Sequence, residues 1–166
     1  MLYTKTFDSP LGKIQLLSDQ QKLLGIWFIG QKYFGANYDL TTAQKFAIAP
    51  LTAGLNWLKD YFAGQKPNPE KIPLAFQTSR FRQTVLQTLL TIPYGQTMTY
   101  SQLAKHVAGS AKYTRAVAQA VARNPFLIII PCHRVIGSRG QLTGYAGGIK
   151  RKKTLLGFEK SGRVIW

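Results

Sequence analysis

Cysteine is nearly absent from this sequence of 166 residues, which holds only Cys132. One thiol excludes an intrachain disulfide and a zinc site built from several cysteines. A free thiol is typical of a reducing compartment, so we expect a cytoplasmic protein. No apolar run approaches the roughly 20 residues that span a bilayer, and the first residues form no apolar signal stretch. We therefore expect no membrane partner.

Acidic residues are also scarce, with 6 Asp and Glu against 22 Lys and Arg, which gives a net charge of +16. The imbalance lies in the second half of the chain. Residues 1–75 hold eight lysines, no arginine and five acids, whereas residues 76–166 hold fourteen basic residues and one acid. Such an excess indicates an anionic partner, either nucleic acid or a membrane surface. A basic surface that is merely solvated remains an alternative.

The first half of the chain favours an antiparallel sheet followed by a helix. Strand-like runs at 2–7 and 13–18 flank a turn signal at 8–12, and a third apolar run covers 23–29. Apolar residues at helical spacing then extend over 43–62. A proline-rich linker follows, with Pro67, Pro69 and Pro73. These features predict a domain of residues 1–75 and a second domain of residues 76–166.

Helices dominate the start of the second half. Apolar spacing predicts a helix over 81–90 that ends before Pro93. Thr99 and Gln102 have the spacing of a capping box, so a helix should begin there and end at Gly109. A further helix is predicted over 112–123, stopped by Asn124-Pro125 and carrying the basic residues Arg115 and Arg123. The pair reads either as a helix-turn-helix or as an ordinary helical hairpin.

Cys132 follows a fully apolar run, residues 126–130, that predicts a buried strand. Most lone cysteines are inert and buried, but this one precedes the polar pair His133-Arg134. We expect Arg134 to favour the thiolate form of Cys132. If strand geometry continues, His133 points to the opposite face and reaches the sulfur only through a water or a local turn.

Glu159 is the one carboxylate among residues 76–166 and lies on a predicted basic helix over 149–159. A nucleophile and its base need a third group that orients the base, and Glu159 could orient His133 in this way. A surface salt bridge between Glu159 and a lysine is the other interpretation.

The residues around Cys132 resemble the active-site motif of the O6-alkylguanine-DNA alkyltransferases. The motif is IPCHRVIG over 130–137, and further matches follow the family's order. They are IPYG at 92–95 with Thr99-Tyr100, RAV at 115–117, Asn124-Pro125, TGYAGG at 143–148 and the segment 153–159. The resemblance is strong over about 76–166 and weak over 1–75. Several ordered motifs are far more specific than one short motif.

The resemblance implies a role for each matching position. Cys132 would be the nucleophile in a Cys–water–His–Glu network with His133 and Glu159. Tyr100 would donate a proton or hydrogen bond to guanine N3, so that the base leaves neutral. Arg115 would fill the space of a flipped-out nucleotide.

Further implied roles concern the pocket and the DNA. Asn124 would be the hinge between the recognition helix and the active-site segment. Tyr145 and Ala146 would line the base pocket, and the carbonyls of Cys132 and Val135 would accept from the guanine amino group. The recognition helix also carries Ala116 and Arg123, which we expect at the DNA.

The implied protein is α/β (α+β), with a small ribonuclease-H-like antiparallel-sheet domain and a winged helix-turn-helix-like domain. It would bind double-stranded DNA through the minor groove as a monomer. One alkyl group would pass irreversibly from O6-alkylguanine, or from O4-alkylthymine, to Cys132. No cofactor is expected. No metal is expected either, because the N-terminal Cys and His zinc ligands of some relatives are missing here.

Three rival functions remain open from the sequence. A lesion-binding relative without transfer activity usually has Trp in place of the cysteine, so the presence of Cys132 argues against that function. A cysteine hydrolase would turn over and keep a free thiol, unlike a protein that gains a stable adduct. A plain DNA-binding module would leave Tyr100 and Glu159 without a role.

Overall fold

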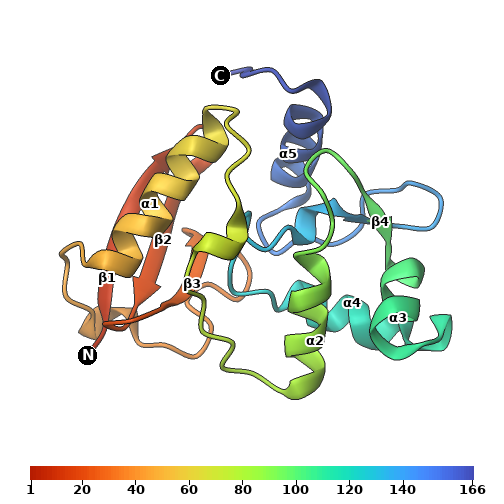
Figure 1. Cartoon of the computed structure of the whole chain (residues 1–166), viewed down its shortest axis with the longest axis horizontal. Helices are drawn as coiled ribbons and strands as arrows, with labels where there is room; N and C mark the ends of the chain where they lie inside the picture. The colour runs from red at the N-terminus through yellow and green to blue at the C-terminus, as the bar shows by residue number, and fades with distance from the viewer. The chain divides into compact units, whose positions relative to one another are not determined.

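The computed structural model describes residues 1–166, which form two compact units (Figure 1). Unit 1 comprises Met1–Gln77 with the short segments Pro125–Ile129 and Val164–Trp166. Unit 2 comprises Thr78–Asn124 and Ile130–Arg163. The chain therefore returns twice to unit 1 after Gln77, whereas the predicted domains 1–75 and 76–166 have a single boundary. No helix is long and apolar enough to cross a membrane.

Unit 1 is built on an antiparallel sheet in the order β1-β2-β3. Its strands are β1 (Tyr3–Ser9), β2 (Gly12–Ser18) and β3 (Leu23–Phe28), which confirms the predicted meander. Every residue of β3 is buried. Gly25 has a specific purpose in this strand, because the Trp27 ring lies where a Cβ at Gly25 would be.

Helix α1 (Ala49–Phe62) packs on this sheet and buries Leu51, Trp57 and Leu58. It starts later than the helix predicted over 43–62. Pro50 lies in its first turn, where the missing N–H costs nothing. The connections hold two short 3-10 helices, η1 (Leu40–Thr42) and η2 (Pro69–Lys71).

Unit 2 packs three helices against one another: α2 (Arg80–Leu89), α3 (Tyr100–Ala108) and α4 (Thr114–Ala122). The predicted capping box is confirmed, since Thr99 Oγ1 accepts from Gln102 N and Gln102 Oε1 accepts from Thr99 N. Gly109 then ends α3 in the left-handed conformation, with φ 77°. The 3-10 helix η3 (Ala111–Tyr113) turns the chain into α4, which gives the helix-turn-helix connection.

The rest of unit 2 carries the segments that follow Asn124. They are the 3-10 helix η4 (Cys132–Arg134), the strand β5 (Val135–Ile136) and the helix α5 (Ile149–Ser161). Strand β5 pairs in parallel with β4 (Met98–Thr99), directly before α3. This short two-stranded sheet holds the residues after Cys132 beside the start of α3.

The prediction of a buried strand over 126–130 was wrong. The segment is buried but turns, and its only bridge joins Phe126 to Ile26 of β3. Ile128 has φ 72°, a left-handed conformation that β-branched residues rarely adopt. Apolar composition identified the burial correctly, but a short apolar run does not define a strand.

Two glycines of unit 2 provide a test of these helix assignments. At both Gly109 and Gly157 an added Cβ would meet no atom within 4 Å, so only backbone preference differs. Gly109→Ala should destabilise the protein by about 1 kcal/mol, because its φ is left-handed. Gly157→Ala, inside α5, should stabilise it by about 0.5–1 kcal/mol. Thermal unfolding should therefore shift in opposite directions; a shift of the same sign in both variants would contradict the two assignments.

Candidate active site

Cys132 begins the 3-10 helix η4 and is 3% exposed. Its N–H donates to the Ile130 carbonyl at 2.8 Å, and its own carbonyl accepts from Val135 N. The tight turn replaces the strand geometry expected here. His133 is therefore not forced to the opposite face of a sheet, and both side chains lie in the interior of unit 2.

The two residues that follow Cys132 in η4 belong to a buried ion-pair cluster around Glu159. His133 Nε2 is 2.6 Å from Glu159 Oε2, and Arg134 donates to both oxygens of the same carboxylate at 2.7 and 3.2 Å. Gly95 N also donates to Glu159 Oε1, at 3.3 Å. Glu159 is 4% exposed, so the interpretation as a surface salt bridge was wrong.

Arg134 belongs to this cluster rather than to the thiol. Besides Glu159 it donates to the Ile92 carbonyl at 2.7 Å, and its guanidinium lies 5.6 Å from the centre of the Tyr94 ring. Its donors thus join η4 to α5 and to the segment after α2. The cation that lowers the pKa of Cys132 is Lys152, and an effect of Arg134 on the thiol stays a prediction.

Opposing effects set the pKa values of the pair. Burial would raise the pKa of Glu159, but His133 and Arg134 together hold it well below its usual range. Burial lowers the pKa of His133 although Glu159 opposes the shift, so we take the imidazole as neutral at pH 7. Nε2–H then donates to Glu159. The unprotonated Nδ1 is buried and has no hydrogen-bond partner in the protein, which leaves it available as an acceptor.

The thiol itself is held in its protonated form. Burial raises the pKa of Cys132 to about 11, while a hydrogen bond from Asn124 and the charge of Lys152 partly oppose that shift. Asn124 is 3% exposed and donates through Nδ2 to the Ile130 carbonyl at 2.9 Å. Its N–H donates to Val121 O of α4, so one residue connects the end of α4 to the cysteine turn.

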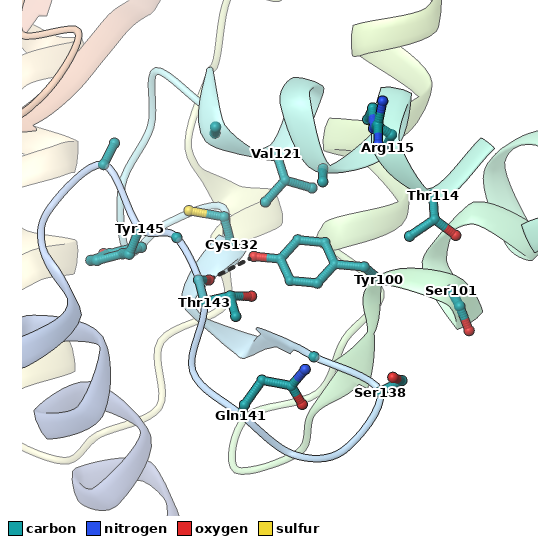
Figure 2. A pocket seen from close by; sticks show the side chains of 15 residues that line it. Tyr100, Ser101, Thr114, Arg115, Val121, Cys132, Ser138, Gln141, Thr143 and Tyr145 are labelled. Carbon is teal, nitrogen blue, oxygen red and sulfur yellow. Dashed lines mark hydrogen bonds between the residues drawn. The ribbon is translucent and has the colours of Figure 1, made fainter. Parts of the chain in front are cut away.

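A cavity of about 640 Å³ opens in front of Cys132. Figure 2 shows Val121 and Tyr100 pointing into it from α4 and α3. Residues of the loop before α5 close its other side, among them Thr143, Tyr145 and Ala146. A cavity of this volume, with mainly apolar walls and a few polar groups, suits a small ligand.

The sequence matches two family descriptions that together cover nearly the whole chain. Residues 1–76 match the 6-O-methylguanine DNA methyltransferase ribonuclease-like domain, and residues 80–161 match the DNA binding domain of the same family. The methylated-DNA–protein-cysteine methyltransferase of Mycobacterium leprae is 41% identical over 96% of this chain and 93% of its own. This chain belongs to that family.

Solved structures agree with the assignment. Mycobacterium tuberculosis OGT in complex with DNA is 38% identical, with a TM-score of 0.86 over 96% of this chain and 94% of its own. The O6-methylguanine-DNA methyltransferase from the archaeon Pyrococcus kodakaraensis is 25% identical, with a TM-score of 0.69 over 96% of this chain and 99% of its own. The expected fold of both halves is thereby confirmed.

The residues named from the family's motifs do not all reach the cavity. Cys132, Tyr100, Arg115, Tyr145 and Ala146 line it. Arg115 is exposed, and Figure 2 shows it on α4. The six other named residues are not part of the lining; they are the exposed Ala116 and Arg123 and the buried His133, Glu159, Asn124 and Val135.

Thr143, in the loop before α5, and Lys152, in the first turn of α5, were not predicted as site residues from the sequence. The Thr143 carbonyl accepts from Tyr100 Oη at 3.1 Å, the contact drawn in Figure 2. It also accepts from Nζ of Lys152 at 3.1 Å. Lys152 stands among several basic residues at the start of α5, and nothing in that run distinguishes the buried one.

The depressed pKa of Glu159 predicts a dependence of stability on pH. Glu159→Gln leaves Arg134 and His133 without their carboxylate and should cost about 3 kcal/mol at pH 7. A carboxyl whose folded pKa is lowered contributes stability that is complete above its ordinary pKa of 4.5 and is lost as the pH falls below it. The gap between parent and variant should therefore narrow in acid.

Chemical denaturation from pH 7 down to pH 3 measures this gap. Glu70→Gln is the matched control, because that carboxylate is exposed and the same charge is removed. A gap for Glu159→Gln that stays constant with pH would show that the cost comes from packing rather than from the ionised carboxylate.

Proposed function

We propose that Cys132 removes the alkyl group from O6-alkylguanine in duplex DNA and keeps it. The observation that carries this is the position of the chain's only cysteine, at a cavity of about 640 Å³ and ahead of a buried His–Glu pair. The sulfur forms a bond to the alkyl carbon, and the bond from that carbon to guanine O6 breaks. The thioether has no mild route back to a thiol, so each molecule repairs one lesion.

His133 takes the thiol proton in this proposal. Its unprotonated Nδ1 is the available acceptor, and a bridging water can carry the proton from the sulfur. The imidazolium that forms is stabilised by the Glu159 carboxylate at 2.6 Å. Glu159 is thus a positioning residue, which sets the tautomer of His133 and balances its charge.

Tyr100 supplies the proton on the leaving side. Burial raises the pKa of its hydroxyl, which keeps it protonated at neutral pH and able to donate. The base would be placed between Tyr100 and Cys132, with its N3 toward the hydroxyl. Carbonyls of Cys132 and Val135 would accept from the guanine amino group, although that of Cys132 already accepts from Val135 N.

DNA is the partner, and we propose that α4 enters its minor groove. Arg115 at the rim of the cavity would occupy the place of the extruded nucleotide. Ala116 is exposed and small, so the helix can approach the groove closely, while Arg123 at the C-terminal end can reach phosphate. Phosphate contacts by the basic half supply affinity without sequence preference.

We further propose an oligomeric state, a location and a second substrate. The protein acts as a monomer in the reducing compartment that holds the DNA, the cytoplasm. O4-alkylthymine is a second substrate if the cavity accepts the smaller base. Residues 1–75 support the second domain and carry no chemistry of their own.

Cys132→Ser should bind alkylated duplex DNA with unchanged affinity and accept no alkyl group. The measurement is intact mass after incubation with DNA containing O6-methylguanine. The parent should gain one methyl group per molecule and lose its free thiol. A parent that releases demethylated DNA repeatedly without a change in mass would instead be a hydrolase. Transfer by the serine variant at the parent's rate would show that Cys132 is not the acceptor.

Arg115→Ala should slow repair in duplex DNA by about tenfold or more, because the extruded nucleotide loses its substitute. Transfer from free O6-benzylguanine should change little, since no base needs to leave a duplex. Arg80→Ala, an exposed arginine outside the cavity lining, is the control for loss of one charge. Equal losses on both substrates would place Arg115 in the chemistry or the fold.

A further inference from the structure

Lys152 is fully buried, with 0% of its surface exposed, although it lies in the basic run that begins α5. Its Nζ donates to the carbonyls of Thr143 and Gly144 at 3.1 and 3.2 Å. Both acceptors are neutral backbone groups rather than a carboxylate. A buried ammonium without a carboxylate is costly, and burial lowers the pKa of Lys152 to about 8. A charge kept under such conditions indicates a use for it.

The Thr143 carbonyl is shared between two donors. Tyr100 Oη and Lys152 Nζ each lie 3.1 Å from it, and Nζ is 5.7 Å from the centre of the Tyr100 ring. The hydroxyl that the proposed reaction needs for the base is therefore already donating to the loop. A hydroxyl has one proton to donate, so the contact with Thr143 and a contact with guanine N3 exclude each other.

We propose that Lys152 is a positioning residue that keeps the Thr143 carbonyl hydrogen-bonded while Tyr100 turns its hydroxyl to the base. This inference rests on the proposed function of Tyr100. With Lys152 in place, the carbonyl keeps a charge-assisted hydrogen bond after Tyr100 leaves, and the loop from Thr143 to Tyr145 keeps its position. Without it, release of Tyr100 leaves a carbonyl unpaired, so Tyr100 stays on the loop.

Other charged and titratable groups surround Lys152. The Tyr100 ring faces it from α3, and Cys132 and His133 of η4 lie close enough to feel its charge. Its charge lowers the pKa values of both Cys132 and His133. Loss of that charge could therefore affect the thiol directly, and the test has to separate this route from the one through Tyr100.

A double-mutant cycle separates the two routes. Single-turnover transfer from O6-methylguanine in DNA is measured at pH 7 for the parent, Lys152→Met, Tyr100→Phe and the double variant. We expect Lys152→Met to slow the parent about tenfold and to have less than about a twofold effect when Tyr100 is already Phe. Equal slowing in both backgrounds overturns the inference, because a direct effect on the thiol or on packing does not need the hydroxyl.

Lys153→Met is the matched control, since it removes the same charge from an exposed neighbour. It should change the rate less than about twofold in either background. Thermal unfolding verifies that each variant folds. If the parent gains no alkyl mass, both the proposed function and this inference are wrong. If the parent transfers normally but Lys152→Met slows transfer equally with Tyr100 and with Phe at that position, only the inference is wrong.

A second measurement needs no change at Lys152. The ratio of the parent rate to the Tyr100→Phe rate cancels the ionisation of Cys132 and His133, which both proteins share. Lys152 loses its proton as the pH rises through about 8, and its hydrogen bond to the Thr143 carbonyl is then weaker because it is no longer charge-assisted, so the ratio should fall between pH 7 and pH 9. Tyr100, whose pKa is raised above 10.0, remains protonated over that range. A ratio independent of pH contradicts the inference even if Lys152→Met fails to fold.

Discussion

The buried carboxylate of Glu159 is the interaction on which the rest of unit 2 depends. It accepts from His133, Arg134 and Gly95, and Arg134 extends the connection to the Ile92 carbonyl. Four separate segments are thereby fixed by one negative charge: α5, the cysteine turn η4, the turn at Gly95 and the end of the α2 region. A buried carboxylate is stable only with such complete pairing, so these segments need one another.

The two buried cations of the site have different partners. Arg134 neutralises Glu159, and so His133 can remain neutral with a free acceptor nitrogen. Lys152 is the other buried cation, but its partners are backbone carbonyls on the cavity side. Before DNA arrives, the two groups at the cavity that the proposed reaction uses are thus a neutral thiol and a neutral phenol.

Local signals in the sequence predicted local structure well, and long-range pairing poorly. The capping box at Thr99 and the glycine stop at Gly109 are decided within one turn of chain, and both were predicted. The run 126–130 was correctly predicted as buried but wrongly as a strand, because hydrophobicity reports burial and not the path of the backbone. The pairing of Arg134 with Glu159 and of Lys152 with Thr143 was not predicted, since the partners are brought near only by the fold. Family motifs suggested Tyr100, and Glu159 was singled out as the one carboxylate among residues 76–166; spacing alone could not connect either residue to Cys132.

The burial of Cys132 has a consequence for how long the protein stays usable. Peroxide and disulfides attack the thiolate form of cysteine at exposed positions. A sulfur that is 3% exposed, with its pKa raised to about 11, presents almost none of that form. A molecule able to act once has no later chance if its sulfur is oxidised first. The same burial that slows ionisation therefore preserves the acceptor in storage until a damaged base fills the cavity.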